Sequence, residues 1–121
     1  MPDNDRPSGE LSLTITRPEP GGLILHVSGD LDLLTAPSLD AEITRLLSDS
    51  PGPLVLDLSE VPFFGSSALA VLIRAAEAAG SKGVRLLLVA PNRAVLRPLE
   101  VTQTVELFSI HDSVESALDT L

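Results

Sequence analysis

Two short apolar runs, separated by a segment of helical periodicity, constrain the fold of this chain more than any other feature. The runs cover residues 54–58 and 84–89, and each has the length of a buried central strand. Between them, one face of a helix is formed by Leu69, Leu72, Ile73 and Ala76. Strands joined through a helix pair in parallel by a right-handed crossover. The pattern therefore predicts a βαβ unit whose helices lie on one face of a sheet.

The start of the chain has a different pattern. Apolar and polar residues alternate over residues 11–16 and again over 23–28, and the Pro/Gly-rich segment 18–22 between them is typical of a turn. We therefore expect an antiparallel hairpin. The whole chain is predicted to be α/β, with a mixed four- to five-stranded sheet built from this hairpin plus parallel βαβ units, and with helices packed on one face. Residues 1–10 are expected to be a flexible tail, and 11–121 a single domain.

Local signals also predict where several elements begin and end. Gly80 is expected to end the central helix in the left-handed conformation, and Pro98 to end or kink the next helix. Residues 105–108 are expected to form a short edge strand. Asp112 and Glu115 have the spacing of a capping box, with Asp in place of Ser or Thr, so they are expected to begin the last helix.

Charge and composition narrow the class of partner. The chain has 17 acidic and 8 basic residues and a net charge of −9, which disfavours binding to nucleic acid or to an anionic membrane. No apolar run is long enough to span a bilayer, and residues 1–7 lack the apolar core of a signal peptide. The chain has no cysteine, which excludes disulfides and thiolate metal sites. We expect a cytoplasmic protein without a cofactor or metal.

Two hydroxyls stand where a loop becomes the central helix. Ser66 and Ser67 follow Phe63, Phe64 and Gly65 and precede the helical stripe. The start of a helix exposes unpaired N–H groups and a partial positive charge, so it tolerates an oxyanion. Such a serine is either a plain helix cap or a phosphate acceptor, and one residue can serve as both. The two phenylalanines are, in the simplest interpretation, core residues.

An enzymatic reading has little support in the sequence. A nucleophile elbow built on Ser67 requires a glycine where Leu69 stands, and a serine triad would have to recruit His26 or His111, which nothing places nearby. His26 is expected on the outer face of its strand and His111 in a loop. The sequence contains no phosphate-binding glycine loop and no cluster of metal ligands. We therefore expect a protein that is not an enzyme.

Four segments, taken together, resemble a known family. They are Gly29-Asp30-Leu31-Asp32 followed by Thr35, which is expected to cap the first helix; the apolar run 54–58; the segment Phe63-Phe64-Gly65-Ser66-Ser67-Ala68-Leu69; and the helix near 92–99. Their order and spacing resemble a STAS domain, specifically a bacterial anti-sigma factor antagonist. The resemblance covers about residues 10–121.

The resemblance implies a function and a set of residues. Such an antagonist binds an anti-sigma factor that is itself a serine kinase, and binding releases a sigma factor. The kinase inactivates the antagonist by phosphorylating a serine at the start of the second helix, and a metal-dependent serine phosphatase reverses this. Ser66 matches the acceptor, and Ser67 is its neighbour. The implied partner-binding residues are Asp30, Asp32, Phe63, Phe64, Gly65, Ser67 and Ala68.

Two positions depart from the family pattern. Gly65 stands where the family has Asp, and Ala68 stands where it has Gly. These changes favour an alternative function, that of a non-phosphorylated STAS adaptor subunit in a transporter or signalling complex. Simpler roles also remain for the charged residues. Aspartate is common in turns, so the simpler role of Asp30 and Asp32 is to form a solvated turn. The arginines at 93 and 97 are in the simplest reading exposed helix charges.

Overall fold

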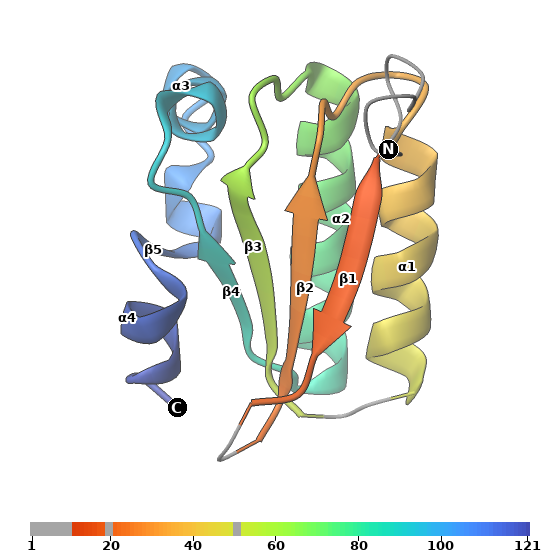
Figure 1. Cartoon of the computed structure of the whole chain (residues 1–121), viewed down its shortest axis with the longest axis vertical. Helices are drawn as coiled ribbons and strands as arrows, with labels where there is room; N and C mark the ends of the chain where they lie inside the picture. The colour runs from red at the N-terminus through yellow and green to blue at the C-terminus, as the bar shows by residue number, and fades with distance from the viewer. Residues whose placement is uncertain (1–10, 19–20, 50–51) are drawn as a thin grey trace, which may run out of the picture.

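A five-stranded mixed sheet forms the centre of the domain. The computed structural model describes residues 11–18, 21–49 and 52–121, so the predicted tail at 1–10 lies outside the described residues. Strand order follows the chain, with β1 antiparallel to β2 and all other neighbours parallel (Figure 1). This confirms the predicted hairpin and parallel units. The strands are β1 Ser12–Thr16, β2 Leu23–Ser28, β3 Leu54–Glu60, β4 Leu86–Val89 and β5 Ser109–His111.

Two long helices cover one face of this sheet. Helices α1 (Ala36–Asp49) and α2 (Ser66–Lys82) lie side by side behind the strands in Figure 1. The main core lies between these helices and the inward side chains of β2, β3 and β4, such as Leu25, Leu56 and Leu88. The apolar stripe of α1 is buried and consists of Leu39, Ile43, Leu46 and Leu47.

The buried stripe of α2 differs from the predicted one. Only Leu72 of the predicted set is fully buried; the others are partly exposed. The stripe that faces the core consists of Ala68, Val71, Leu72, Ala75 and Ala79. Alanines on this face let α2 lie close to α1 and the sheet, so the larger Leu69 and Ile73 are displaced to its flanks. Periodicity alone does not choose between two stripes offset by one residue.

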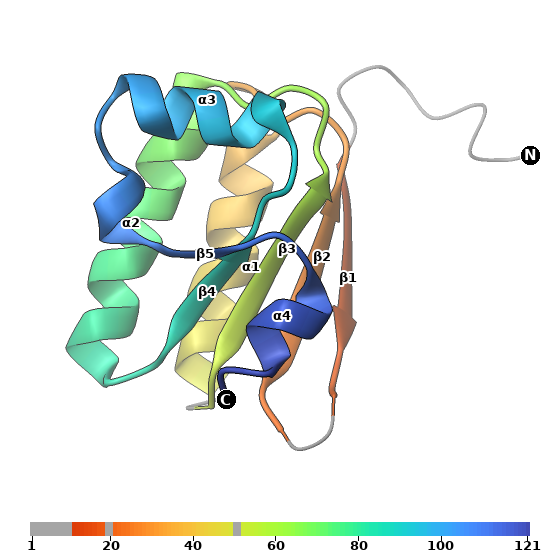
Figure 2. The same ribbon diagram turned by 90° about the vertical axis from the view of Figure 1, so that its left-hand side faces the viewer.

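The last helix corrects the expectation that all helices lie on one face. Helix α4 (Val114–Leu118) packs on the opposite face of the sheet, in front of the strands in Figure 2. The crossover helices α1 and α2 are held to one face by their right-handed connections. Among the described residues, α4 does not connect two strands of the sheet, so this constraint does not act on it. The second face is apolar at Ile24, Val55, Leu87 and Val89, and Ala117 of α4 covers it.

The predicted end of α2 at Gly80 is wrong, and the next helix does not end at Pro98. Helix α2 continues through Gly80, and Gly83 takes the left-handed conformation with φ of 70°. The Gly83 N–H donates to the Gly80 carbonyl and the Val84 N–H to the Ala79 carbonyl, which closes the helix end while Val84 becomes buried. Helix α3 (Arg93–Val101) contains Pro98 and runs three residues past it. The proline removes one hydrogen bond, whereas burial of the following Leu99 holds the last turn in place.

The final segment also differs in detail. Residues 105–108 are not a strand, because η2 (Val105–Leu107) is a 3-10 helix and the edge strand follows it as β5. The cap of α4 is Ser113, whose hydroxyl accepts from the Ser116 N–H at 3.0 Å, so Asp112 and Glu115 do not form the predicted box. Leu121 lies beyond the end of α4 and is exposed.

Candidate functional site

The loop after β2 and the loop before α2 lie against each other at one end of the sheet. Leu31 and Phe64 form a parallel β-bridge. The Leu31 N–H donates to the Phe63 carbonyl, and the Gly65 N–H donates to the Leu31 carbonyl, both at 2.8 Å. The structure therefore brings the 29–32 segment next to the start of α2, although more than thirty residues separate them in the chain. All of the predicted site residues come from these two loops and the first turn of α2.

Neither serine acts as a helix cap. The N-cap of α2 is Gly65, with extended backbone angles (φ −91°, ψ 177°), and the helix has no side-chain cap. Instead, the Gly65 carbonyl accepts from the N–H groups of Ala68 and Leu69. Ser66 is the first residue of the helix and is exposed, whereas Ser67 is half-buried. The plain-cap interpretation of these serines is therefore wrong, and the Ser66 hydroxyl stands at the positive end of a 17-residue helix, where it caps no N–H group of the described residues.

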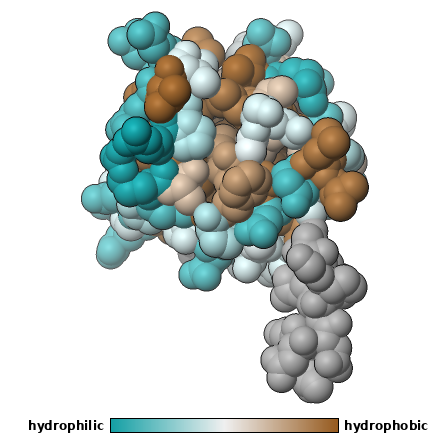
Figure 3. All heavy atoms as spheres, turned by 90° about the horizontal axis from the view of Figure 1, so that it is seen from above, coloured by the Kyte–Doolittle hydropathy of each residue, from teal (hydrophilic) through white to brown (hydrophobic). Residues whose placement is uncertain are grey.

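Large apolar side chains are exposed near this helix start. Phe63 is 53% exposed; Leu33, which lines a surface hollow together with Ser67, is 77% exposed, and the next residue, Leu34, is 81% exposed. Seen from above, the same end of the molecule shows apolar side chains among hydrophilic ones (Figure 3). Exposed leucines at such levels are typical of a contact surface when they cluster. The sequence analysis missed Leu33 and Leu34, although two leucines between a turn and a helix, outside the helical stripe, were a usable signal.

Two of the predicted contact residues belong to the core instead. Ala68 is 0% exposed, and Phe64 is buried beneath the loop. Their side chains do not reach the surface, so both are removed from the proposed contact set. The methyl group of Ala68 lies inside the main core. Gly65 stays near the surface, where an added Cβ would lie 3.3 Å from the Phe63 ring and 3.4 Å from the Leu31 carbonyl oxygen.

Asp32 forms a turn, which is the simpler of the two roles expected for it. Its Oδ1 atom accepts from the N–H groups of Leu34 and Thr35, both at 3.0 Å. The Thr35 hydroxyl, which is buried, donates to the Asp30 carbonyl at 2.8 Å and accepts from the Asp32 N–H at 2.9 Å. These bonds form a closed turn that leads into α1. The Thr35 hydroxyl therefore bonds back to the 30–32 segment and not to an N–H group of α1, so the predicted side-chain cap is not formed; the Thr35 backbone carbonyl accepts from the Ser38 N–H instead.

Helix α3 lies on the far side of the Phe63 loop. The Asn92 side chain donates through Nδ2 to the Val61 carbonyl at 2.8 Å and, more weakly, to the Leu58 carbonyl at 3.4 Å. Its Oδ1 atom is buried and has no partner among the described residues. Asn92 thus ties the start of α3 to the segment that leads toward Ser66. The next turns of α3 present Arg93 and Arg97 as exposed charges, as predicted.

A second polar cluster, which the sequence analysis missed, crosses three strands on the outer face. His26 donates from Nδ1 to Asp57 Oδ2 at 2.9 Å, and its Nε2 lies 3.1 Å from the Thr16 hydroxyl. Ser59 donates to Asp57 Oδ1 through its hydroxyl at 2.7 Å and its N–H at 3.1 Å. Burial by itself raises the pKa of Asp57, but the bonds from Ser59 and His26 outweigh it and hold the pKa below its ordinary value.

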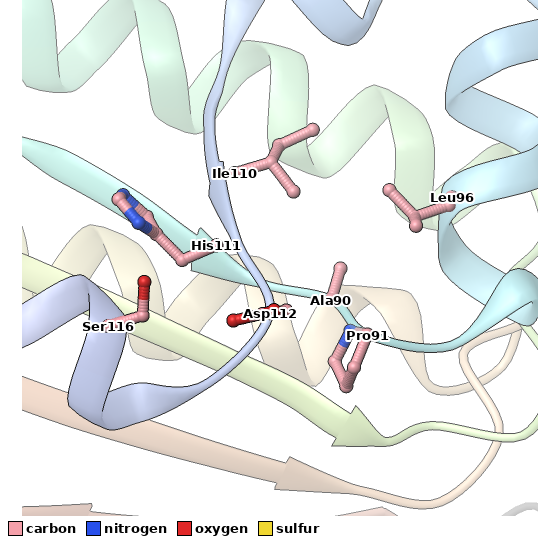
Figure 4. A pocket seen from close by; sticks show the side chains of 7 residues that line it. All are labelled: Ala90, Pro91, Leu96, Ile110, His111, Asp112 and Ser116. Carbon is pink, nitrogen blue, oxygen red and sulfur yellow. The ribbon is translucent and has the colours of Figure 1, made fainter.

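The hollow between α3, β5 and α4 has the features of a surface depression rather than an active site. It measures about 420 Å³ and contains His111, Asp112 and Ser116 on one side and Leu96 and Ile110 on the other (Figure 4). His111 Nε2 lies 3.1 Å from the Ser109 hydroxyl. Among the described residues, no group of His, Asp or Glu has the arrangement of a metal site. Over the described residues 11–18, 21–49 and 52–121, no helix is long and apolar enough to cross a bilayer.

Comparison with known proteins agrees with this geometry. The STAS domain family matches residues 14–117. The anti-sigma-F factor antagonist RsfB of Mycobacterium tuberculosis is 35% identical over 108 residues, which cover 85% of this chain and 88% of RsfB. The anti-sigma-F factor antagonist RsfA of the same organism is 31% identical over 113 residues, covering 92% of this chain and 88% of RsfA. A crystal structure of an anti-sigma factor antagonist from Mycobacterium paratuberculosis superimposes with a TM-score of 0.83 at 31% identity, over 92% of this chain and 93% of that one.

Proposed function

This chain belongs to the STAS domain family, among its anti-sigma factor antagonists, and from that membership we propose that its unmodified form binds an anti-sigma factor that is a serine kinase. Binding withdraws the anti-sigma factor from its sigma factor and frees the latter for transcription. Antagonists of this family are regulators rather than enzymes. The chain therefore works through a contact surface in the cytoplasm, without nucleic acid or membrane as a partner.

The observation that carries the proposal is the exposed Ser66 hydroxyl at the start of α2, with no cap to form and with the 29–32 loop beside it. A kinase can reach such a hydroxyl without unfolding the domain. We propose that the contact surface consists of Asp30, Asp32, Phe63, Gly65, Ser66 and Ser67, extended by the exposed Leu33 and Leu34.

Phosphorylation of Ser66 switches this surface off for an electrostatic reason. A phosphate adds about −1.5 to −2 charges at pH 7. The N–H groups and dipole of the α2 start accommodate that charge in the free domain. Against the apolar flank of Phe63, Leu33 and Leu34, which a bound partner desolvates, the same charge is unfavourable. A metal-dependent serine phosphatase then removes the phosphate and restores binding.

The test uses purified anti-sigma factors of the source organism that carry a kinase domain, assayed one at a time. We expect one of them to bind the wild type, to phosphorylate Ser66 with ATP, and to leave Ser66→Ala unmodified in intact-mass measurements. Ser66→Asp should lose about 3 kcal/mol of binding, roughly a hundredfold in Kd, while its thermal melt stays native. Ser67→Ala is the matched control and should still be phosphorylated. Wild-type binding that Ser66→Asp leaves intact would contradict the switch.

The adaptor function remains the second candidate, and Gly65 is the observation that favours it. The N-cap of α2 lacks the carboxylate that the resembled family pattern has at this position. Protein purified from its own cells distinguishes the two functions. Phosphate on Ser66 supports the switch, whereas its lasting absence in a stable membrane complex supports the adaptor.

A further inference from the structure

A shallow groove separates the Phe63 loop from α3, on the side of Ser66 opposite the 29–32 loop. It measures about 360 Å³; its floor is apolar and its rim basic. The floor comes from Pro62, Phe63, Ala94 and Pro98, with the buried Phe64 beneath them, and the rim comes from Arg93 and Arg97. In Figure 1, α3 stands on one side of the α2 start and the loop after β2 stands on the other.

The charge of this groove is opposite to that of the molecule. The chain carries a net charge of −9, yet two arginines stand one helical turn apart here. Arg97 has no ion-pair partner in the described part of the chain. Arg93 pairs with Glu100 at 3.3 Å, but both side chains are about half exposed or more, and such a pair contributes little to stability. Both guanidinium groups are therefore available to an incoming carboxylate.

The groove is also held in shape before any partner arrives. Asn92 bonds the start of α3 to the Val61 carbonyl, and Val95 and Leu99 anchor the inner face of α3 in the main core. A Cβ added to Gly65 would lie 3.3 Å from the Phe63 ring, so this ring lies close to the start of α2. A preformed surface loses less conformational entropy on binding, so its contacts yield more net affinity.

We propose that this groove binds an acidic segment of the anti-sigma factor, with a carboxylate on Arg97 and an apolar side chain on Phe63. The inference rests on the proposed function and extends its contact surface across α3. Asp30 lies on the opposite flank of Ser66, so the two flanks carry opposite charges. A partner with the complementary pattern docks in one orientation, because the reversed one places like charges together. That orientation presents the Ser66 hydroxyl to the kinase in a defined direction.

Charge reversal on the groove, compared with charge reversal elsewhere, tests the proposal. Arg97→Glu changes the net charge by −2, and Lys82→Glu makes the same change at the last residue of α2, about 24 Å along the helix from Ser66. Calorimetry with the kinase identified above should show that Arg97→Glu binds about tenfold or more weakly than the wild type at low salt. The difference in Kd between the two proteins should be smaller near 0.5 M NaCl. The Kd of Lys82→Glu should stay within about twofold of the wild-type Kd. Both variants should keep the wild-type Tm.

Each outcome has a separate meaning. If no kinase-bearing anti-sigma factor binds the wild type, the proposed function fails and this inference fails with it. If the wild type binds and Arg97→Glu matches Lys82→Glu at every salt concentration, the function stands and the groove is not part of the surface. If sedimentation of the chain alone shows self-association that Arg97→Glu abolishes, the occupant is a second copy, and the proposal of an acidic partner segment is overturned.

Discussion

Replacement of Asp32 separates two roles that the sequence assigned to one carboxylate. The resemblance implies a partner contact, whereas the structure shows Oδ1 accepting from the N–H groups of Leu34 and Thr35. Asp32→Ala removes both bonds. Asp32→Asn keeps an oxygen at the same place and removes only the charge. The pair of variants therefore distinguishes a structural acceptor from a charged contact.

The expected loss for Asp32→Ala follows from these bonds. Removal of a side chain that caps backbone N–H groups costs about 0.5–2 kcal/mol. Water can reach the Leu34 N–H, but the Thr35 N–H is partly buried and loses its acceptor. We therefore expect a loss of about 1–2 kcal/mol, which lowers the Tm of a domain of this size by roughly 5 °C. Asp32→Asn should melt within about 2 °C of the wild type.

Thermal unfolding followed by circular dichroism provides the stability of each variant, and calorimetry with the kinase provides its affinity. If Asp32 is also a charged contact, Asp32→Asn keeps its Tm and loses affinity. If Asp32→Ala unfolds at the wild-type temperature, the inference that this carboxylate holds the 30–35 turn is refuted.

Two further predictions concern groups outside the contact surface. Because the folded domain lowers the pKa of Asp57, that carboxylate stabilises the fold above its unfolded pKa of about 3.9, and the stabilisation is lost as pH falls through the lower folded pKa. In denaturant titrations from pH 6 to pH 3, the free energy of unfolding should therefore fall more steeply for the wild type than for Asp57→Asn. If the two free energies fell in parallel with pH, the lowered pKa of Asp57 would be contradicted. Asn92→Ala should lower the free energy of unfolding by about 1–3 kcal/mol, since the buried Val61 carbonyl loses its donor. Arg93→Ala, an exposed change on the next residue, should alter it by less than about 0.5 kcal/mol.

Much of the fold could be predicted because the signals that encode it are local. In several segments, a few neighbouring residues are enough to indicate which side chains are buried. These segments are the alternating residues 11–16 and 23–28, the apolar run at 54–58 and the stripe of α1. The right-handed crossover rule then orders the parallel strands. The contact between the 29–32 segment and the start of α2 came instead from the family resemblance, because periodicity does not place two loops together.

Tertiary packing decided between alternatives that local sequence signals do not distinguish, such as two possible ends and two possible buried faces of α2. Gly80 and Gly83 are both able to end α2, and the helix ends where Val84 can enter the core. Two offset stripes of α2 are both apolar, and the one that faces inward contains three alanines, Ala68, Ala75 and Ala79. That choice buries Ala68 and leaves Ser66 exposed.

The sequence by itself determined the order of strands and helices and the position of a serine at the start of α2. Only the tertiary structure decided which side chains near that serine reach the surface, that α4 crosses to the second face, and that His26 meets Asp57 across 31 residues of chain. The physical reason is that burial of a single segment is encoded in its own periodicity, whereas contacts between distant segments depend on shape and volume that no single segment contains.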